Sequence, residues 1–91
     1  MTKTVTLYGA AGCSFCRRAE QLLHSKGVRD LNRIEVDAQP AQLQRMIERS
    51  GRRSVPQIFI DEAHVGGFDD LEALERSGRL DVILMGQPDP K

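Results

Sequence analysis

The sequence has few of the residues that stabilise small exported proteins. Two of its 91 residues are cysteines, none is tryptophan, three are phenylalanine and one is tyrosine. A disulfide between cysteines three positions apart constrains little of the unfolded chain, so a disulfide-stapled exported scaffold is not expected. Acidic and basic residues number 13 each, and the formal charge is zero. That balance gives no reason to expect a nucleic-acid or anionic-membrane surface.

Long apolar runs are also missing. No stretch approaches the roughly 20 apolar residues of a membrane span, and Met1–Thr4 has no signal-peptide h-region before the first expected strand. We therefore expect a cytoplasmic protein that does not contact a membrane. In a reducing compartment, closely spaced cysteines are expected to be catalytic or metal-binding. The length fits one domain, which we predict over residues 1–85, with a disordered tail at 86–91.

The two cysteines form the motif Cys13-Ser14-Phe15-Cys16. Before it, Thr4–Tyr8 alternates like a strand, and Gly9–Gly12 is a turn of small residues. After it, Arg17–Leu23 has the apolar spacing of an amphipathic helix. This predicts Cys13 at the N-terminus of a helix and Cys16 one turn later on the same side.

That placement suits thiol–disulfide exchange. The thiolate is the nucleophile, and a free cysteine near pH 7 is mostly thiol. Unpaired backbone N–H groups and the positive end of the helix dipole favour negative charge on Cys13, whereas Cys16 gains less and is more shielded. A C-x-x-C beside a βαβ pattern is typical of redox proteins. Our hypothesis is that Cys13 attacks and Cys16 resolves.

Two other interpretations of the cysteines remain open at this stage. They could form a purely structural disulfide, although so short a loop would stabilise little. They could also form half of a zinc site with His24 and His64, but those histidines lack the spacing of a ligand pair. His24 is more plausible as an exposed helix residue, and His64 as the start of a strand.

The rest of the chain predicts the order βαβαββα. Hydrophobic periodicity, capping residues, prolines and glycines set the expected boundaries. A turn of only three residues after the third strand requires an antiparallel hairpin. Asp69 is the expected N-cap of the third helix, with Glu72 completing a capping box. The expected elements are strand 3–8, helix 13–26, strand 31–36, helix 40–51, strand 55–60, strand 64–65, a helix from 69 to Gly78, and a last helical turn at 80–84.

Three sequence blocks carry a resemblance to a known family. They are the C-S-F-C motif, Ser50–Ile60 with its Val55-Pro56 pair, and Gly66–Leu71. With these blocks in this order, the chain resembles bacterial glutaredoxins from Val5 to about Leu84. The resemblance implies a thioredoxin-like α/β fold, with a four-stranded mixed sheet flanked by helices.

The resemblance also implies a glutathione site. In the family the peptide bond before the proline that matches Pro56 is cis, and the Val55 backbone pairs with an extended thiol substrate, as an added strand would. The Gly66–Asp69 turn implies a site for the γ-glutamyl end, since free N–H groups at a helix start suit a carboxylate. The residues implied to bind glutathione are Phe15, Arg53, Val55, Pro56, Gly67, Phe68 (backbone donor) and Asp69 (amine partner).

The chain departs from the family pattern at several positions. Cys-Pro-Tyr-Cys is the common motif, and here Ser14 replaces the proline. The family lysine three residues before the first cysteine is Ala10, and a basic or amide position on the second helix falls at Leu43. Arg45 or Arg49 could replace that charge, and each could equally be a solvated charge on the helix. We therefore expect a weakened hold on the glycine carboxylate of glutathione.

The resemblance implies a glutathione-dependent oxidoreductase. It would reduce protein–glutathione mixed disulfides and protein disulfides, with glutathione as co-substrate and a potential near the cytosolic poise. Its partners would be glutathione and disulfide-bonded client proteins, with no nucleic acid, and a monomer is expected. One alternative is a dimer holding a [2Fe–2S] cluster through Cys13 and glutathione, because Ser14 resembles members that do so. Another is a redoxin reduced by thioredoxin reductase.

Overall fold

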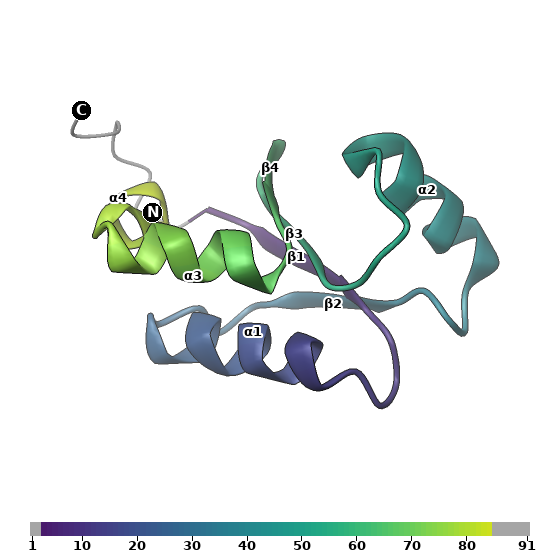
Figure 1. Cartoon of the computed structure of the whole chain (residues 1–91), viewed down its shortest axis with the longest axis horizontal. Helices are drawn as coiled ribbons and strands as arrows, with labels where there is room; N and C mark the ends of the chain where they lie inside the picture. Colours follow the sequence, from purple (N-terminus) through teal and green to yellow (C-terminus); the bar gives the residue numbers. More distant parts are fainter. Residues whose placement is uncertain (1–2, 85–91) are drawn as a thin grey trace.

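The structure, a computed structural model, describes residues 3–84 and alternates strands with helices before ending in a hairpin and two helices (Figure 1). The elements are β1 (Val5–Gly9), α1 (Ser14–Ser25), β2 (Asn32–Glu35), α2 (Pro40–Ser50), β3 (Gln57–Ile60), β4 (Ala63–Gly66), α3 (Phe68–Arg76) and α4 (Arg79–Leu84). The predicted order βαβαββα is confirmed, with the expected last helical turn present as α4. No helix within residues 3–84 is long and apolar enough to cross a bilayer.

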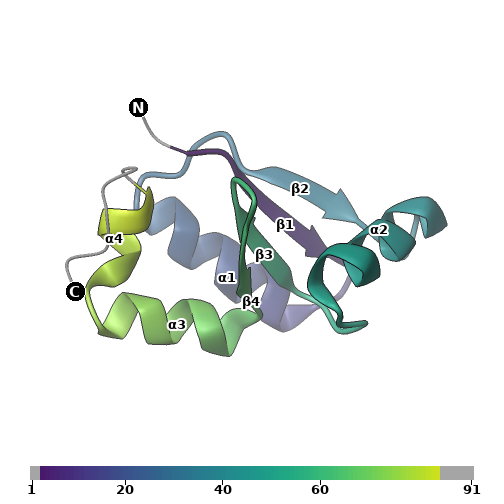
Figure 2. The ribbon, with the colours of Figure 1, turned by 90° about the horizontal axis from the view of Figure 1, so that it is seen from above.

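The four strands form one mixed sheet in the order β2-β1-β3-β4. β1 runs parallel to β2, while the β1–β3 and β3–β4 pairs are antiparallel. Helices cover both faces: α1 and α3 lie together on one side and α2 lies on the other (Figures 1 and 2). This is the expected thioredoxin-like arrangement, and it brings the carboxyl end of β1 close to the start of α1.

Each face of the sheet has its own apolar core. Side chains at alternating strand positions point to opposite faces, so Leu7 packs toward α1 while Tyr8 packs toward α2. Apolar spacing predicts an inward stripe on each of the first two helices, and the residues of these stripes are buried or half-buried: Cys16, Ala19, Leu22 and Leu23 on α1, and Leu43, Met46 and Ile47 on α2. The buried set on the α1 side is Val5, Leu7, Cys16, Ala19, Leu23, Ile58, Ile60, Leu71, Leu80 and Leu84, and on the α2 side it is Tyr8, Val36, Met46 and Phe59.

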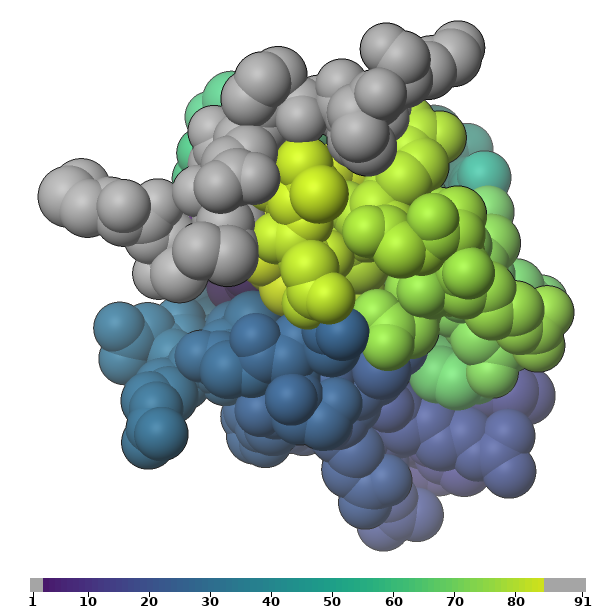
Figure 3. Space-filling view, turned by 90° about the vertical axis from the view of Figure 1, so that its left-hand side faces the viewer, coloured from purple at the N-terminus to yellow at the C-terminus, as the bar shows by residue number. Residues whose placement is uncertain are grey.

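The end of the molecule away from the cysteines is closed by α4. Lys26, at the C-terminus of α1, places its Nζ 2.9 Å from Glu75 of α3 and 3.0 Å from Asp81 of α4. Figure 3 shows α4 (yellow) beside α3 (yellow-green) and above the blue surface of α1 and the loop that follows it. These ion pairs and the burial of Leu80 and Leu84 fix α4 on the α1 side of the sheet.

Most elements differ from their predicted bounds by one or two residues, and two of these differences have a clear physical cause. β3 begins at Gln57 rather than Val55, because Pro56 has no N–H to give to a neighbouring strand. α3 begins at Phe68, so its N-cap is Gly67 and not Asp69. Asp69 then falls in the first turn, where it cannot cap the helix. The predicted tail at 86–91 lies outside the described residues.

Candidate active site

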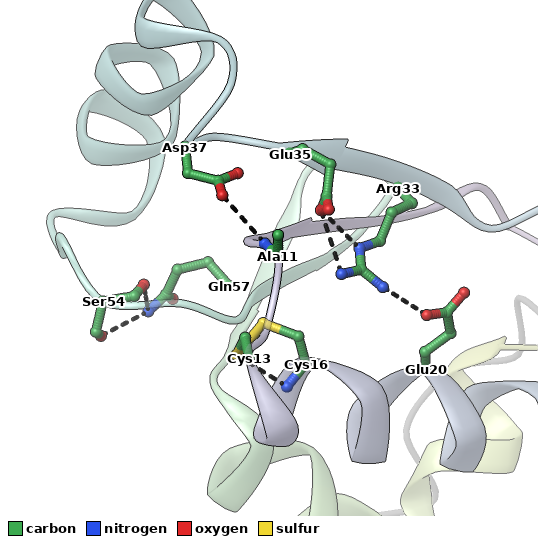
Figure 4. The surroundings of a disulfide bond; sticks show 9 residues. All are labelled: Ala11, Cys13, Cys16, Glu20, Arg33, Glu35, Asp37, Ser54 and Gln57. Atoms are coloured by element: carbon green, nitrogen blue, oxygen red, sulfur yellow. Dashed lines mark hydrogen bonds and ion pairs between the residues drawn. A yellow bond between two sulfur atoms is a disulfide. The ribbon is translucent and has the colours of Figure 1, made fainter.

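Cys13 and Cys16 are joined by a disulfide at the N-terminus of α1 (Figure 4). Cys13 is the N-cap of the helix, and its Sγ accepts a hydrogen bond of 3.1 Å from the backbone N–H of Cys16. Cys13 is half-buried, whereas Cys16 has no exposed surface. The geometry places the two sulfurs as the sequence predicted, and only the Cys13 sulfur is open to attack from outside.

The loop before Cys13 is held by backbone contacts. The Ala11 N–H donates to Asp37 Oδ2 at 3.2 Å, and the Cys13 N–H donates to the Ala10 carbonyl at 3.3 Å. Gly12 has φ +75°, a conformation that side chains disfavour. Asp37, just beyond β2, thus ties the loop to the sheet and fixes where α1 begins.

A groove lies beside the disulfide and has a volume of about 240 Å³. Its walls come from three separate segments of the chain, which the fold brings together. Phe15, which lies between the two cysteines in the sequence, is one of the lining residues, and Figure 4 shows Ser54 and Gln57, two others, on the side of the sheet end where the disulfide lies. The residues that line the groove are Phe15, Arg52, Ser54, Val55, Pro56, Gln57, Gly67, Phe68, Asp69 and Asp70.

Six of the seven predicted glutathione residues line this groove, and Arg53 is the exception. Phe15, one of the six, is half exposed, and its ring centroid lies 6.0 Å from that of Phe68. The Val55–Pro56 peptide bond is cis, as the resemblance implied. Arg53 is exposed outside the groove, and its neighbour Arg52 lines it instead. The resemblance pointed to Arg53 by its matching position, and no local pattern singled out Arg52, since both precede the same extended segment.

Gln57 forms a buried polar connection behind the groove. Its side chain is 1% exposed, and its Nε2 donates to the Ser54 carbonyl at 3.0 Å. Its Oε1 lies 2.7 Å from His64 Nε2, which makes His64 the donor. Burial, followed by the nearby Arg52 cation, lowers the pKa of His64. The His64 ring nitrogen is therefore hydrogen-bonded to Gln57 and not to a cysteine.

The turn between β4 and α3 is capped by Asp70. Its Oδ2 accepts from the Gly67 N–H at 3.0 Å and lies 3.2 Å from Arg52 Nη1. The Gly67 hydrogen bond, with Arg52 second, lowers the pKa of the Asp70 carboxyl. Because Asp70 provides the cap, Asp69 is left exposed at the groove.

The other candidate basic residues do not reach the groove. Arg49 Nη1 donates to the Tyr8 hydroxyl at 3.0 Å, and its guanidinium lies 4.0 Å from the Phe59 ring centroid. Arg45 and Arg49 line a hollow on the α2 side of the sheet. Leu43 is half-buried and packs against the second core. Neither arginine lines the groove, so of the two alternatives the structure favours a helix charge outside this site.

Metal ligands do not gather within residues 3–84: no group of three or more His, Cys, Asp or Glu side chains is placed to hold an ion. His24 is exposed on α1, and His64 bonds Gln57. What the site does offer is a sulfur that can be attacked, a buried sulfur that can leave as a thiolate, and a neighbouring groove. That combination supports reversible thiol–disulfide exchange.

Comparison with known proteins agrees with this chemistry. The family model described as Glutaredoxin matches residues 5–65. A glutaredoxin of Neisseria meningitidis is 50% identical over 82 residues, which cover 90% of this chain and 96% of that protein. The solution structure of glutaredoxin from Brucella melitensis superimposes with a TM-score of 0.81 at 46% identity, covering 96% of this chain and 95% of that one.

A more distant structure carries the same fold. The crystal structure of a buckwheat glutaredoxin–glutathione complex has a TM-score of 0.79 at 26% identity, and the match covers 92% of this chain and 77% of that one. The fold, the Cys13–Cys16 disulfide and these similarities agree: the chain belongs to the glutaredoxin family of thiol–disulfide oxidoreductases.

Proposed function

We propose that the protein is a glutathione-dependent disulfide reductase acting on protein–glutathione mixed disulfides and on protein disulfides. The observation that carries this is the groove beside the half-buried Cys13, with Arg52 and Asp69 on its walls. A basic and an acidic side chain suit a small ligand that bears both carboxylates and an ammonium group. The glutathione in the buckwheat complex supports the same choice.

In this proposal each wall of the groove would bind a different part of glutathione. The Val55 backbone next to Pro56 would pair with the extended cysteinyl portion of glutathione. The N–H groups at the start of α3, at Phe68, would receive the γ-glutamyl carboxylate, and the exposed Asp69 would receive its ammonium. Phe15 and Phe68 would cover the apolar stem. Arg53 would then act from outside the groove, while Arg52 approaches the ligand directly.

The reaction on a mixed disulfide takes two exchanges. The Cys13 thiolate attacks the glutathione sulfur, the protein thiolate leaves and takes a proton from water, and Cys13 carries glutathione. A second glutathione thiolate then attacks the glutathione sulfur of that adduct. Glutathione disulfide forms, and Cys13 leaves as the thiolate. Only Cys13 is required in this cycle.

A protein disulfide needs both cysteines. Cys13 attacks one sulfur of the client and forms a mixed disulfide with it, and the second client sulfur leaves as a thiol. Cys16 then attacks the Cys13 sulfur, the client is released, and the Cys13–Cys16 disulfide forms. Two glutathione molecules reduce that disulfide and leave as glutathione disulfide.

The test separates these two cycles. Cys16→Ser should keep the reduction of a glutathionylated peptide and lose the reduction of a protein disulfide, while Cys13→Ser should lose both. Reduction of a model mixed disulfide and of a disulfide-bonded protein would be measured with glutathione and glutathione reductase. Loss of both activities in Cys16→Ser would contradict the assignment of roles.

The groove can be tested separately. Asp69→Ala should raise KM for glutathione about fivefold or more, the cost of losing a charged hydrogen bond, while the alkylation rate of Cys13 stays unchanged. Asp30→Asn, in the exposed loop before β2, is the matched control. An unchanged KM in Asp69→Ala would remove the amine contact from the proposal.

The cluster-binding alternative stays a prediction. Cys13 offers one thiolate per chain, so a [2Fe–2S] centre would need donors from a second subunit and from glutathione. Anaerobic purification distinguishes it: a brown dimer supports a cluster, and a colourless monomer does not. Turnover with thioredoxin reductase in place of glutathione would support the third possibility.

A further inference from the structure

An ion cluster lies next to the buried sulfur of the disulfide. Arg33 extends from the edge strand β2 and is 25% exposed. Its Nη1 lies 2.6 Å from Glu20 Oε1 on α1, and its Nη2 lies 3.2 Å from Glu35 Oε2 on β2. Figure 4 shows the guanidinium between the two carboxylates, on the same side of β1 as the cysteines.

Gly9 is what allows this arginine to approach Cys16. A Cβ placed on Gly9 would lie 3.2 Å from Arg33 Nε and 3.2 Å from Cys16 Sγ. Because Arg33 Nε and Cys16 Sγ are each 3.2 Å from the same point, they cannot be further apart than twice that distance. Residue 9 has no side chain to separate them. Leu7 Cδ2 is the nearest atom to that position, at 3.1 Å, so the sulfur and the cation lie beside an apolar side chain, and a side chain on residue 9 would add more carbon there.

We propose that Arg33 is a positioning residue for disulfide opening, and that it stabilises the negative charge that develops on Cys16 Sγ. A reductant thiolate attacks the accessible Cys13 Sγ, a bond forms between the two sulfurs, and the Cys13–Cys16 bond breaks. The electron pair leaves on Cys16, which then takes a proton from water. A preorganised cation beside the leaving atom lowers the barrier, and a better-stabilised thiolate leaves faster.

The charges around Cys16 set the expected size of the effect. Glu20 and Glu35 neutralise part of the guanidinium charge, and the Asp37 carboxylate is occupied by the Ala11 N–H. Arg33 is also partly exposed. We therefore expect a contribution of about three- to tenfold in rate, below the hundredfold or more that a dry, unopposed donor can supply. Removing Glu20 should strengthen the cation and accelerate opening.

A plain structural role makes a different prediction. If the Arg33–Glu20 pair only tied β2 to α1, removing either partner would loosen the same contact and change the rate in the same direction. Under the electrostatic role, Arg33→Gln and Glu20→Gln change the rate in opposite directions. The sign of the Glu20→Gln effect is therefore the decisive readout.

The experiment follows reduction of the oxidised full chain by dithiothreitol under pseudo-first-order conditions. Samples are acid-quenched, alkylated and weighed by mass spectrometry. Arg33→Gln should slow the reaction about three- to tenfold, Arg33→Lys should recover most of the rate, and Glu20→Gln should exceed the parent rate. Arg76→Gln, which removes an arginine paired with Glu72 on α3, is the control and should match the parent.

The result that overturns the proposal is an unchanged rate in Arg33→Gln, or a slower rate in both Arg33→Gln and Glu20→Gln. Thermal unfolding of each oxidised variant shows whether folding is intact. Dithiothreitol needs no glutathione groove, so failure of the glutathione proposal leaves this test unaffected. Conversely, a parent-like rate in Arg33→Gln with intact glutathione turnover would remove only the role of Arg33.

Discussion

Replacing Gly66 with alanine should destabilise the protein more than replacing any glycine that only needs a positive φ. Gly66 has φ +120°, and a Cβ there would collide with the Asp70 carboxylate, with Cγ 2.7 Å and Cβ 3.0 Å away. Gly78 provides the matched control. Its φ is +77°, and nothing lies within 4 Å of its Cβ position.

The cost can be worked out from these contacts. A non-glycine residue at positive φ costs about 1–3 kcal/mol, and both variants lose that amount. In Gly66→Ala, Asp70 must also move away from the Gly67 N–H. The Asp70 side chain is 46% exposed, so losing that bond and the ion pair with Arg52 costs about 1–2 kcal/mol after solvent screening. The sum is about 2–5 kcal/mol for Gly66→Ala and about 1–3 kcal/mol for Gly78→Ala.

Urea unfolding followed by far-UV circular dichroism measures both values, because the chain has no tryptophan to report by fluorescence. The parent and both variants are compared at neutral pH with the cysteines reduced. The reasoning fails if Gly66→Ala costs no more than Gly78→Ala. In a double variant, Gly66→Ala with Asp70→Ala, the second substitution should add little to the loss, because Asp70 has already moved away from the Gly67 N–H and Arg52.

Three further predictions concern charge. Asp70→Asn should lower the free energy of unfolding by about 1 kcal/mol near pH 7. Because the Gly67 N–H and Arg52 lower the pKa of Asp70, the gap in stability between the parent and this variant should shrink as the pH falls below the ordinary value of 3.8. Urea unfolding at several pH values measures that gap. Burial and the Arg52 cation lower the pKa of His64, so the free energy of unfolding should decrease as the pH drops below the ordinary histidine pKa of 6.5. His64→Gln should lack that decrease, and an identical pH profile of stability in the parent and the variant would contradict the role of His64. Ala10→Lys should tighten glutathione binding in calorimetry, and no gain would count against a weakened carboxylate site.

Much of the fold follows from local patterns in the sequence. The small-residue turn before Cys13, Pro40 at the start of α2 and the short turn of the hairpin each locate a boundary to within one residue. The hairpin turn has two residues where three were predicted, because Ala63 belongs to β4. The burial of Met46 and Leu71 follows from helical spacing alone. The cis bond at Pro56 came from the resemblance and not from these patterns, because most X–Pro bonds are trans.

The cap of α3 shows where local patterns fail. Asp69 and Asp70 are adjacent acidic residues, and either could cap a helix whose first residue shifts by one. Which of the two caps the helix depends on Gly66. Because glycine has no Cβ, the Asp70 carboxylate can pack against residue 66 and accept the hydrogen bond from the Gly67 N–H. Since that packing is set by the β4–α3 turn in three dimensions, no spacing rule could assign it. The exposure of Asp69 at the groove follows from the same choice.

Arg33 shows the same limit for electrostatics. In Arg33-Ile34-Glu35-Val36 the polar residues alternate with apolar ones, which predicts a strand with one solvated face. In the sheet both faces are covered, and Leu7 is the parallel partner of Arg33, so the polar residues share the face that packs on α1. These charges are tolerated on that face because β2 is an edge strand, which leaves Arg33 25% exposed, and because Glu20 pairs with the guanidinium. A pattern typical of a solvated face therefore places a cation beside the active-site sulfur, and only the pairing of β1 with β2 reveals it.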